Sequence, residues 1–346
     1  MGRTGRVSAR SRSIGLAIAG AGVLAVAAGV LWPTLQSRGA QAQTGASGGV
    51  IPIPSADADA AASYWASRLS PSGSVTADAP QGSGAPGSGQ PASPGLPSPT
   101  GGLDDAFASG SPMGVSTPLA GAPFSGVPQV GALFGTSSGS IDGQGHYCSG
   151  SVVNSPEGDI VVTAAHCVYD SSGVYTDIAF VPGYHDGQDP YGVWIPSAVV
   201  VAPQWASDSD PDYDVAFLVV HEEGSSSKIQ DVVGSDQLQV RPGYTGLTQV
   251  IGYPESTERP IACTNFTKQF TDSSLASPEM EFDCADFTSG TSGGPFLQDV
   301  DANTGLGEVV GVVGGYQAGG DTAGVSYAAY FGDWVGSLYT QAEAEG

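Results

Sequence analysis

Short apolar runs, each broken after a few residues by Gly, Asp or Pro, make up most of the chain from Gly126 onward. Runs of this length, rich in β-branched residues and spaced by about eight to twelve residues, are typical of strands in an all-β barrel or sandwich. The pattern predicts strands at residues 160–162, 178–181, 198–201, 215–220, 248–251 and 309–313. The roughly 215 residues involved fit one two-barrel unit better than two independent domains.

The last apolar positions change to helical spacing. Trp334, Val335, Leu338 and Tyr339 recur three to four residues apart, which predicts a helix. We expect this closing helix to pack on the second barrel.

Residues 43–124 have a different texture, dominated by Gly, Ser, Pro and Ala. Such a stretch cannot bury enough apolar surface to offset its chain entropy, which predicts a disordered linker or pro-region. Within it, only Ala61 to Leu69 offers a candidate helix, so a structured pro-domain is the weaker alternative.

The amino terminus has the pattern of an export signal. Four Arg and no acidic residue occur in the first 13 residues, and an uncharged apolar run follows from Ile14 to Trp32. Small residues at Ala40 and Ala42 predict cleavage after Ala42, which makes residues 1–42 a signal peptide and the protein secreted. A retained membrane anchor is the alternative, because about 20 apolar residues can span a bilayer.

The charge balance excludes one class of partner. Five of the ten basic residues and none of the 34 acidic residues precede position 43, so the mature chain would carry a net charge of −29. Because phosphate binding needs clustered Lys and Arg, nucleic acid is not expected as a partner. Solubility of a secreted protein accounts for the acidic surplus, and attraction of a basic substrate is the alternative.

Three segments carry candidate chemistry. Residues 163–167 read TAAHC, residues 213–218 read YDVAFL, and residues 290–295 read GTSGGP. A serine hydroxyl needs an imidazole to take its proton and a carboxylate to orient that imidazole, and His166, Asp214 and Ser292 offer these groups. The order His, Asp, Ser differs from the orders in α/β-hydrolases and subtilisins.

These segments resemble the trypsin or chymotrypsin-like serine peptidases over roughly residues 125 to 342. The GTSGGP form, residues 180–184 (FVPGY) and the leader are more narrowly similar to trypsin-like peptidases of high-GC Gram-positive bacteria. The resemblance implies two antiparallel six-stranded β-barrels with a C-terminal helix, in a peptidase domain spanning residues 125–346. It also implies an active site between the barrels, a polypeptide substrate and no cofactor.

The family resemblance implies roles for these residues. Ser292 would be the nucleophile, His166 the general base and then acid, and Asp214 the residue that orients the imidazole. The backbone N–H groups of Gly290 and Ser292 would form the oxyanion hole, which requires dihedral angles that a side chain resists at the glycine positions.

Four cysteines in an exported chain suggest two disulfides rather than a metal site, because no Cys-x-x-Cys or paired His spacing is present. The resemblance implies that Cys148 pairs with Cys167, which leaves Cys263 with Cys284. Thr291 stands where digestive enzymes place an aspartate that pairs with the new amino terminus after activation. We therefore expect that activation switch to be missing.

The sequence does not decide which substrate side chain the specificity pocket selects. Asp286 lies six residues before Ser292, where trypsins place the carboxylate that selects Arg or Lys. It could line the pocket, or the second disulfide could turn it outward. Gly314 and Gly315 resemble the edge that pairs with an extended substrate. Val312 and Val313 stand where glutamate-selective relatives have a histidine, which makes an acid preference less favoured.

The sequence also suggests functions other than catalysis. A catalytically silent binding or adhesion domain on a flexible stalk is the main rival. The acids Asp208, Asp210 and Asp212 could bind calcium, although solvated loop charge is the simpler interpretation. Residues 299–305 resemble a calcium loop but fit a hairpin turn better. The chain is expected to be a monomer without a metal ion.

Overall fold

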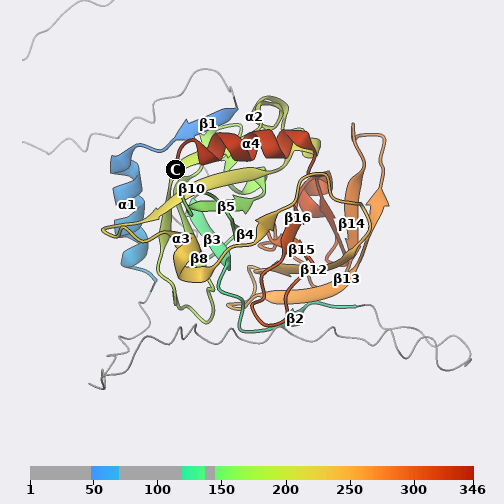
Figure 1. Cartoon of the computed structure of the whole chain (residues 1–346), viewed down its shortest axis with the longest axis horizontal. Helices are drawn as coiled ribbons and strands as arrows, with labels where there is room; N and C mark the ends of the chain where they lie inside the picture. Colours follow the sequence, from blue (N-terminus) through green and yellow to red (C-terminus); the bar gives the residue numbers. More distant parts are fainter. Residues whose placement is uncertain (1–47, 70–118, 137–144) are drawn as a thin grey trace, which may run out of the picture. The chain divides into compact units, whose positions relative to one another are not determined.

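Two β-sheets carry the strands that the apolar runs predict (Figure 1). The computed structural model describes residues 48–69, 119–136 and 145–346, all within one compact unit. The export signal, its cleavage point after Ala42 and the linker between positions 70 and 118 lie outside the described residues.

The first sheet closes into a six-stranded barrel. Its strands follow the order β9-β10-β5-β4-β3-β8, and β8 pairs back to β9 through Phe180 and Trp194. Their bounds are β3 (Val130–Thr136), β4 (Cys148–Val153), β5 (Ile160–Thr163), β8 (Thr176–Pro182), β9 (Trp194–Val201) and β10 (Ala216–Glu222). Every residue of β4 and β5 is buried, so these two strands are covered on both faces.

The second sheet follows the order β11-β16-β15-β12-β13-β14-β17, with β2 pairing β13. Its strands are β2 (Ala122–Pro123), β11 (Gln237–Leu238), β12 (Leu247–Gly252), β13 (Ile261–Phe270), β14 (Glu279–Asp283), β15 (Pro295–Gln298), β16 (Glu308–Val312) and β17 (Val325–Ala328). The N–H of Gly314, just past β16, donates to the carbonyl of Tyr327 in β17 at 3.0 Å. This bond connects the end of β16 with β17, which lie near opposite ends of the strand order, an arrangement consistent with a second barrel.

The remaining short elements lie mainly around the first barrel. They are the β6–β7 hairpin (Tyr169–Asp170, Gly173–Val174), α2 (Pro203–Asp208), α3 (Ile229–Val233) and the 3-10 turns η1 (Ala165–Cys167), η2 (Pro211–Tyr213) and η3 (Tyr316–Gly319). Both disulfides are present, Cys148–Cys167 and Cys263–Cys284.

The closing helix α4 (Asp333–Glu343) forms as expected, but it packs elsewhere. Its buried side chains are Val335, Leu338 and Ala342. The helix lies beside β10 of the first barrel (Figure 1) and contacts β9 and β10. There Tyr339 lies against Phe217, with ring centroids 5.6 Å apart. The expectation of packing on the second barrel was wrong, because helical spacing reveals an apolar face but not the surface that covers it.

Part of the expected linker is ordered. Residues 49–52 form β1 (Gly49–Pro52), which pairs antiparallel with β9, and residues 55–66 form α1 (Ser55–Ala66). In α1 the side chains of Ala58, Ala61 and Trp65 are buried. One face of α1, made of these small and aromatic residues, thus packs against β8 and β9, which composition alone did not predict.

Among the described helices, none is long and apolar enough to cross a membrane. The candidate anchor Ile14 to Trp32 lies outside the described residues.

Candidate active site

His166 and Asp214 lie in direct contact at the end of the first barrel. His166 is in η1, directly after the buried strand β5, and Asp214 follows η2 just before β10. The imidazole Nδ1 lies 2.7 Å from Oδ2 of Asp214, and the backbone N–H of His166 donates to Oδ1 at 2.9 Å. The β5–β10 ladder pairs Thr163 with Ala216, which holds the two turns side by side.

The Asp214 carboxylate is fully buried, with 0% of the side chain exposed. It accepts a third hydrogen bond, from the N–H of Gly315 to Oδ2 at 2.9 Å. A buried carboxylate with several N–H partners is rigid, so it fixes the tautomer and orientation of the imidazole.

The charge state of His166 follows from this pairing. Burial alone lowers the pKa of the imidazole, but the charge of Asp214 and its hydrogen bond outweigh burial, and the pKa is raised above its ordinary value. The side chain remains 21% exposed, so it is open to the cavity described below. The ring is therefore poised to accept a proton and hold it beside Asp214.

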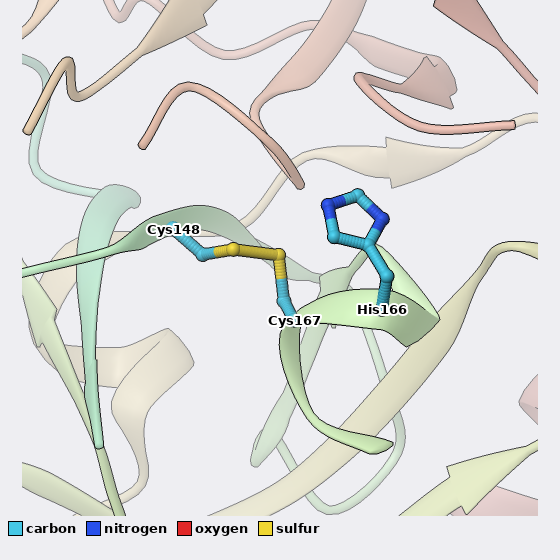
Figure 2. A group of neighbouring side chains, drawn as sticks. All are labelled: Cys148, His166 and Cys167. Carbon is cyan, nitrogen blue, oxygen red and sulfur yellow. A yellow bond between two sulfur atoms is a disulfide. The ribbon is translucent and has the colours of Figure 1, made fainter. Parts of the chain in front are cut away.

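The turn that carries His166 is pinned from several sides. Figure 2 shows the Cys148–Cys167 disulfide beside the His166 ring. The hydroxyl of Tyr147 donates to the carbonyl of Cys167 at 2.7 Å, and that of Tyr175 to the carbonyl of His166 at 3.2 Å. These tyrosines were not identified from the sequence, because a lone tyrosine next to a strand gives no functional signal.

Ser292 lies in a loop between two positions that only glycine can occupy. Gly290 has φ 96° and Gly293 has φ 77°, which are left-handed conformations. A Cβ on Gly293 would lie 2.2 Å from Oγ1 of Thr163, and one on Gly290 would lie 2.4 Å from the carbonyl oxygen of Tyr253. The serine loop therefore packs directly on the end of the first barrel near His166.

The backbone of this loop leaves two N–H groups unused. The carbonyl of Ser289 accepts from Glu255 N at 2.8 Å, and the carbonyl of Thr291 accepts from Gly294 N at 3.0 Å. Because N–H and C=O of a trans peptide point in opposite directions, the N–H groups of Gly290 and Ser292 point away from these partners. Within the described part of the chain, neither N–H donates to a protein acceptor.

A cavity of about 750 Å³ joins these groups. His166 and Ser292 both line it, together with Gly290 and the side chain of Phe287. Its lining also includes the carboxylates Glu255 and Asp321, both exposed, and no Lys or Arg of the described residues. The structure thus brings the predicted base, nucleophile and oxyanion donors to one concave site.

The predicted specificity residues lie elsewhere. Asp286 is exposed, has φ 74° and does not belong to the cavity lining. Gly314 and Gly315 lie against Asp214, where a Cβ on Gly314 would be 2.9 Å from Oδ2. Both glycines therefore let the backbone approach the buried carboxylate closely.

Glu279 supports this approach, and sequence reasoning missed it. It is the first residue of β14 and is fully buried. Its two carboxylate oxygens accept from the N–H of Tyr316 at 3.1 and 2.9 Å, and a Cβ on Gly315 would lie 2.6 Å from Oε2. Burial raises the pKa of Glu279 to about 8. No motif marks this residue, because its partners lie far from it in the chain.

Thr291 is satisfied within its own loop. Its side chain is buried and its hydroxyl donates to the carbonyl of Thr288 at 2.8 Å. The loop therefore uses an internal partner at the position where the resemblance places an aspartate in digestive enzymes.

The candidate metal ligands have other partners. Asp212 accepts from the N–H groups of Ala276 and Ser277, and Asp301 accepts from those of Asn303 and Thr304 in the turn between β15 and β16. The cluster formed by Cys148, His166 and Cys167 owes its closeness to the disulfide.

The fold and the site define a class. A closed antiparallel barrel, a second sheet, and a cleft lined by His166 and Ser292, with a buried Asp214 behind the histidine, are typical of trypsin-like serine peptidases. Residues 125–335 match the family model described as Trypsin, which is more than half of the chain. The chain therefore belongs to the Trypsin family and is a serine endopeptidase.

Solved structures agree with this assignment. The chain is similar to the protease Anisep from Arthrobacter nicotinovorans, with 29% identity, a TM-score of 0.56, and 65% of this chain and 100% of that chain covered. A thermostable serine protease AL20 from an extremophilic microorganism is 25% identical, with a TM-score of 0.54, and 63% and 98% covered. A Glu endopeptidase shares the fold at 18% identity and a TM-score of 0.50, covering 65% and 97%. No curated protein sequence matches the chain.

Proposed function

We propose that the chain is an exported endopeptidase in which Ser292, His166 and Asp214 act as a triad. The observation that carries this is the fully buried Asp214, bonded to Nδ1 of His166, with the imidazole open to the cavity that Ser292 lines. This arrangement leaves the second ring nitrogen, Nε2, to take the proton of a nucleophile in that cavity.

The reaction runs in two halves. Ser292 Oγ attacks the scissile carbonyl carbon while His166 accepts its proton, and the carbonyl oxygen becomes an oxyanion. The N–H groups of Gly290 and Ser292 would stabilise that oxyanion, and loss of one such donor costs about 3 kcal/mol in comparable sites. His166 then protonates the leaving amine, and water repeats the sequence to hydrolyse the acyl-enzyme.

Fluorophosphonate labelling tests the triad. Only an activated serine reacts with such a probe, so we expect labelling of Ser292 in the full chain and its loss in Ser292→Ala and His166→Ala. The neighbouring Thr291 hydroxyl is buried and hydrogen-bonded, and Gly293 has no side chain, so neither neighbour of Ser292 offers a competing hydroxyl. Loss of labelling in Ser292→Ala separates Ser292 from Ser289, which also lines the cavity. Absence of labelling in the folded wild type would favour the silent binding or adhesion domain on a flexible stalk.

We also propose a preference for Arg or Lys in the substrate. Glu255 and Asp321 are carboxylates on a cavity lining without a described basic residue, and Asp286 lies outside that lining. Charge pairing with these acids would favour a basic side chain beside the scissile bond. Gly314 and Gly315 stay candidates for pairing with the extended substrate.

A peptide library read by mass spectrometry tests this preference. We expect cleavage after Arg or Lys, weakened about tenfold in kcat/KM by Asp321→Asn or Glu255→Gln and much less by Asp286→Asn. The reverse ranking would return the specificity role to Asp286. Cleavage after uncharged or acidic residues would remove the preference and keep the triad.

Secretion is proposed from the leader and the two disulfides, which persist in oxidising compartments. The amino-terminal residue of secreted material tests it, and Gln43 is expected. Cell-bound material that retains residues 14–32 would instead show the anchored form. We propose a monomer that needs no cofactor.

A further inference from the structure

Residues 48–69 pack on a surface of the first barrel. This segment itself lies outside the part of the chain that matches the Trypsin family. β10 pairs along one side of β9, and on the other side β8 pairs with β9 at Trp194. Beyond that point the edge of β9 would expose unpaired backbone groups. β1 fills this stretch, with Gly49 opposite Val201 and Pro52 opposite Ala198.

The helix that follows covers the neighbouring face. α1 contacts β8 and β9, and Trp65 is only 1% exposed. The indole N–H of Trp65 donates to the carbonyl of Asp177 at 2.6 Å, and its ring lies 5.1 Å from that of Phe134. Leu69 is also buried, so the apolar contact extends to the end of the described segment.

No disulfide attaches this segment to the first barrel, so apart from the continuous backbone its contacts with the barrel are noncovalent. The segment has no cysteine, and both disulfides join residues after position 147. Strand pairing supplies directional backbone hydrogen bonds, and the buried helix face supplies apolar area, as in complexes formed by strand addition. The match to the Trypsin family begins at residue 125, beyond this segment and the stretch that follows it.

We propose that residues 48–69 are a bound peptide partner of the peptidase domain, one that stays in place when the chain is cut between Leu69 and Leu119. The partner is therefore defined chemically as a strand followed by an amphipathic helix with a buried tryptophan. Mature enzyme cut in this stretch would be a two-chain complex.

The bound segment also reaches the vicinity of the catalytic histidine. A Cβ on Gly48 would lie 2.3 Å from Pro203 N at the start of α2, so the backbones are in close contact. The same helix carries Trp205, whose ring centroid lies 6.5 Å from that of His166. Loss of the segment is thus expected to lower activity, a consequence that rests on the proposed function, whereas binding itself does not.

The test uses the exported full-length chain with Ser292→Ala, which prevents self-cleavage. A recognition sequence for an unrelated site-specific protease is inserted between Gly87 and Ser88, and the cut protein is analysed by native mass spectrometry and gel filtration. We expect the amino-terminal fragment to stay with the domain at one-to-one stoichiometry. Separation of the fragment under native conditions would overturn the proposal.

A matched pair of substitutions locates the contact. Ala61 is buried and Ala60 is exposed on adjacent positions of α1. Because an unpaired carboxylate is costly to bury, we expect Ala61→Asp to release roughly tenfold more fragment than Ala60→Asp after cutting. Equal release from both would overturn the assigned contact face.

A second measurement avoids dependence on folding of the variant domain. Labelled synthetic peptides of residues 48–69 are added to the cut Ser292→Ala protein after a brief urea pulse that releases the bound fragment. The wild-type and Ala60→Asp peptides should enter the complex, and the Ala61→Asp peptide should not. In the active chain, kcat/KM after cutting should fall roughly tenfold with Ala61→Asp relative to Ala60→Asp, while binding results alone decide the proposal.

Discussion

At the scale of single residues, the buried carboxylate of Asp214 holds the imidazole of His166. It receives hydrogen bonds from the imidazole, from the N–H of His166 and from the N–H of Gly315. Two of these three donors are backbone N–H groups that hold the carboxylate in place, so small changes in its chemistry act directly on the imidazole.

Replacing Asp214 by Asn tests this control. The amide would present a donor where Nδ1–H needs an acceptor, which favours the wrong imidazole tautomer. In serine peptidase triads this substitution lowers kcat by about 10⁴-fold. We expect a loss of that order in peptide hydrolysis, with Asp208→Asn, an exposed acid nearby, as a control that leaves kcat close to the wild-type value. Activity near the wild-type level in Asp214→Asn would contradict the orienting role.

The pH dependence of activity follows from the raised pKa of His166. A general base must be neutral, and a raised pKa means that the imidazole keeps its proton to a higher pH. We therefore expect the acid limb of kcat/KM to lie above the ordinary histidine value of 6.5, with activity lost as the pH falls through it. In Asp214→Asn the limb should move to lower pH, because burial then acts without the opposing charge. An unchanged limb would show that another group titrates.

At the scale of elements, β14 supports the turn that reaches the active site. Glu279, at the start of β14, bonds the N–H of Tyr316 in η3 and packs on Gly315, whose N–H holds Asp214. We therefore expect Glu279 to be a positioning residue that acts through the backbone of residues 315–316.

Glu279→Gln tests this support. The glutamine can accept through one oxygen only and places an NH₂ group near the Tyr316 N–H, so we expect kcat to fall about tenfold, the effect of losing roughly one hydrogen bond. Wild-type activity should also change through about pH 8, where Glu279 titrates, and the variant should lack that step. Glu281→Gln, on the same strand but paired with Lys268, is the control. A pH profile identical to the wild type in Glu279→Gln would contradict the assignment.

At the scale of the whole molecule, Asp236 joins the two sheets. It is fully buried and accepts from Ser151 Oγ in β4 at 2.7 Å and from the N–H of Gly307, just before β16, at 2.8 Å. Burial raises its pKa from 3.8 to about 7.

This shift predicts how stability depends on pH. Between pH 4 and 7 the folded state keeps the Asp236 proton that the unfolded chain releases, so the free energy of unfolding should fall as the pH rises. The contribution is at most about 4 kcal/mol, from about three pKa units. Urea unfolding of Asp236→Asn across the same pH range should show a correspondingly flatter curve. Equal slopes in both proteins would mean that Asp236 does not titrate in this window.

The sequence alone predicts much of this architecture. All six predicted strands fall on strands of the structure, namely β5, β8, β9, β10, β12 and β16, although several of these extend beyond the predicted ends. Apolar runs of β-branched residues report burial locally, so they locate strands without knowledge of their partners. The three chemical segments were also found, because each motif is contiguous in the chain. The Cys148–Cys167 disulfide matches the pair that the family resemblance implied, and Cys263–Cys284 matches the pair that then remained.

Tertiary structure decided what depends on partners distant in the chain. It placed α4 on the first barrel, turned Asp286 out of the cavity, brought Glu279 beneath the backbone at Gly315, and gave residues 48–69 a covering surface. Each outcome depends on which surface a side chain packs against, and the pattern of residues along the chain does not specify these long-range contacts. The sequence by itself determined the strands, the reactive groups and their order, whereas only folding determined how these groups are supported.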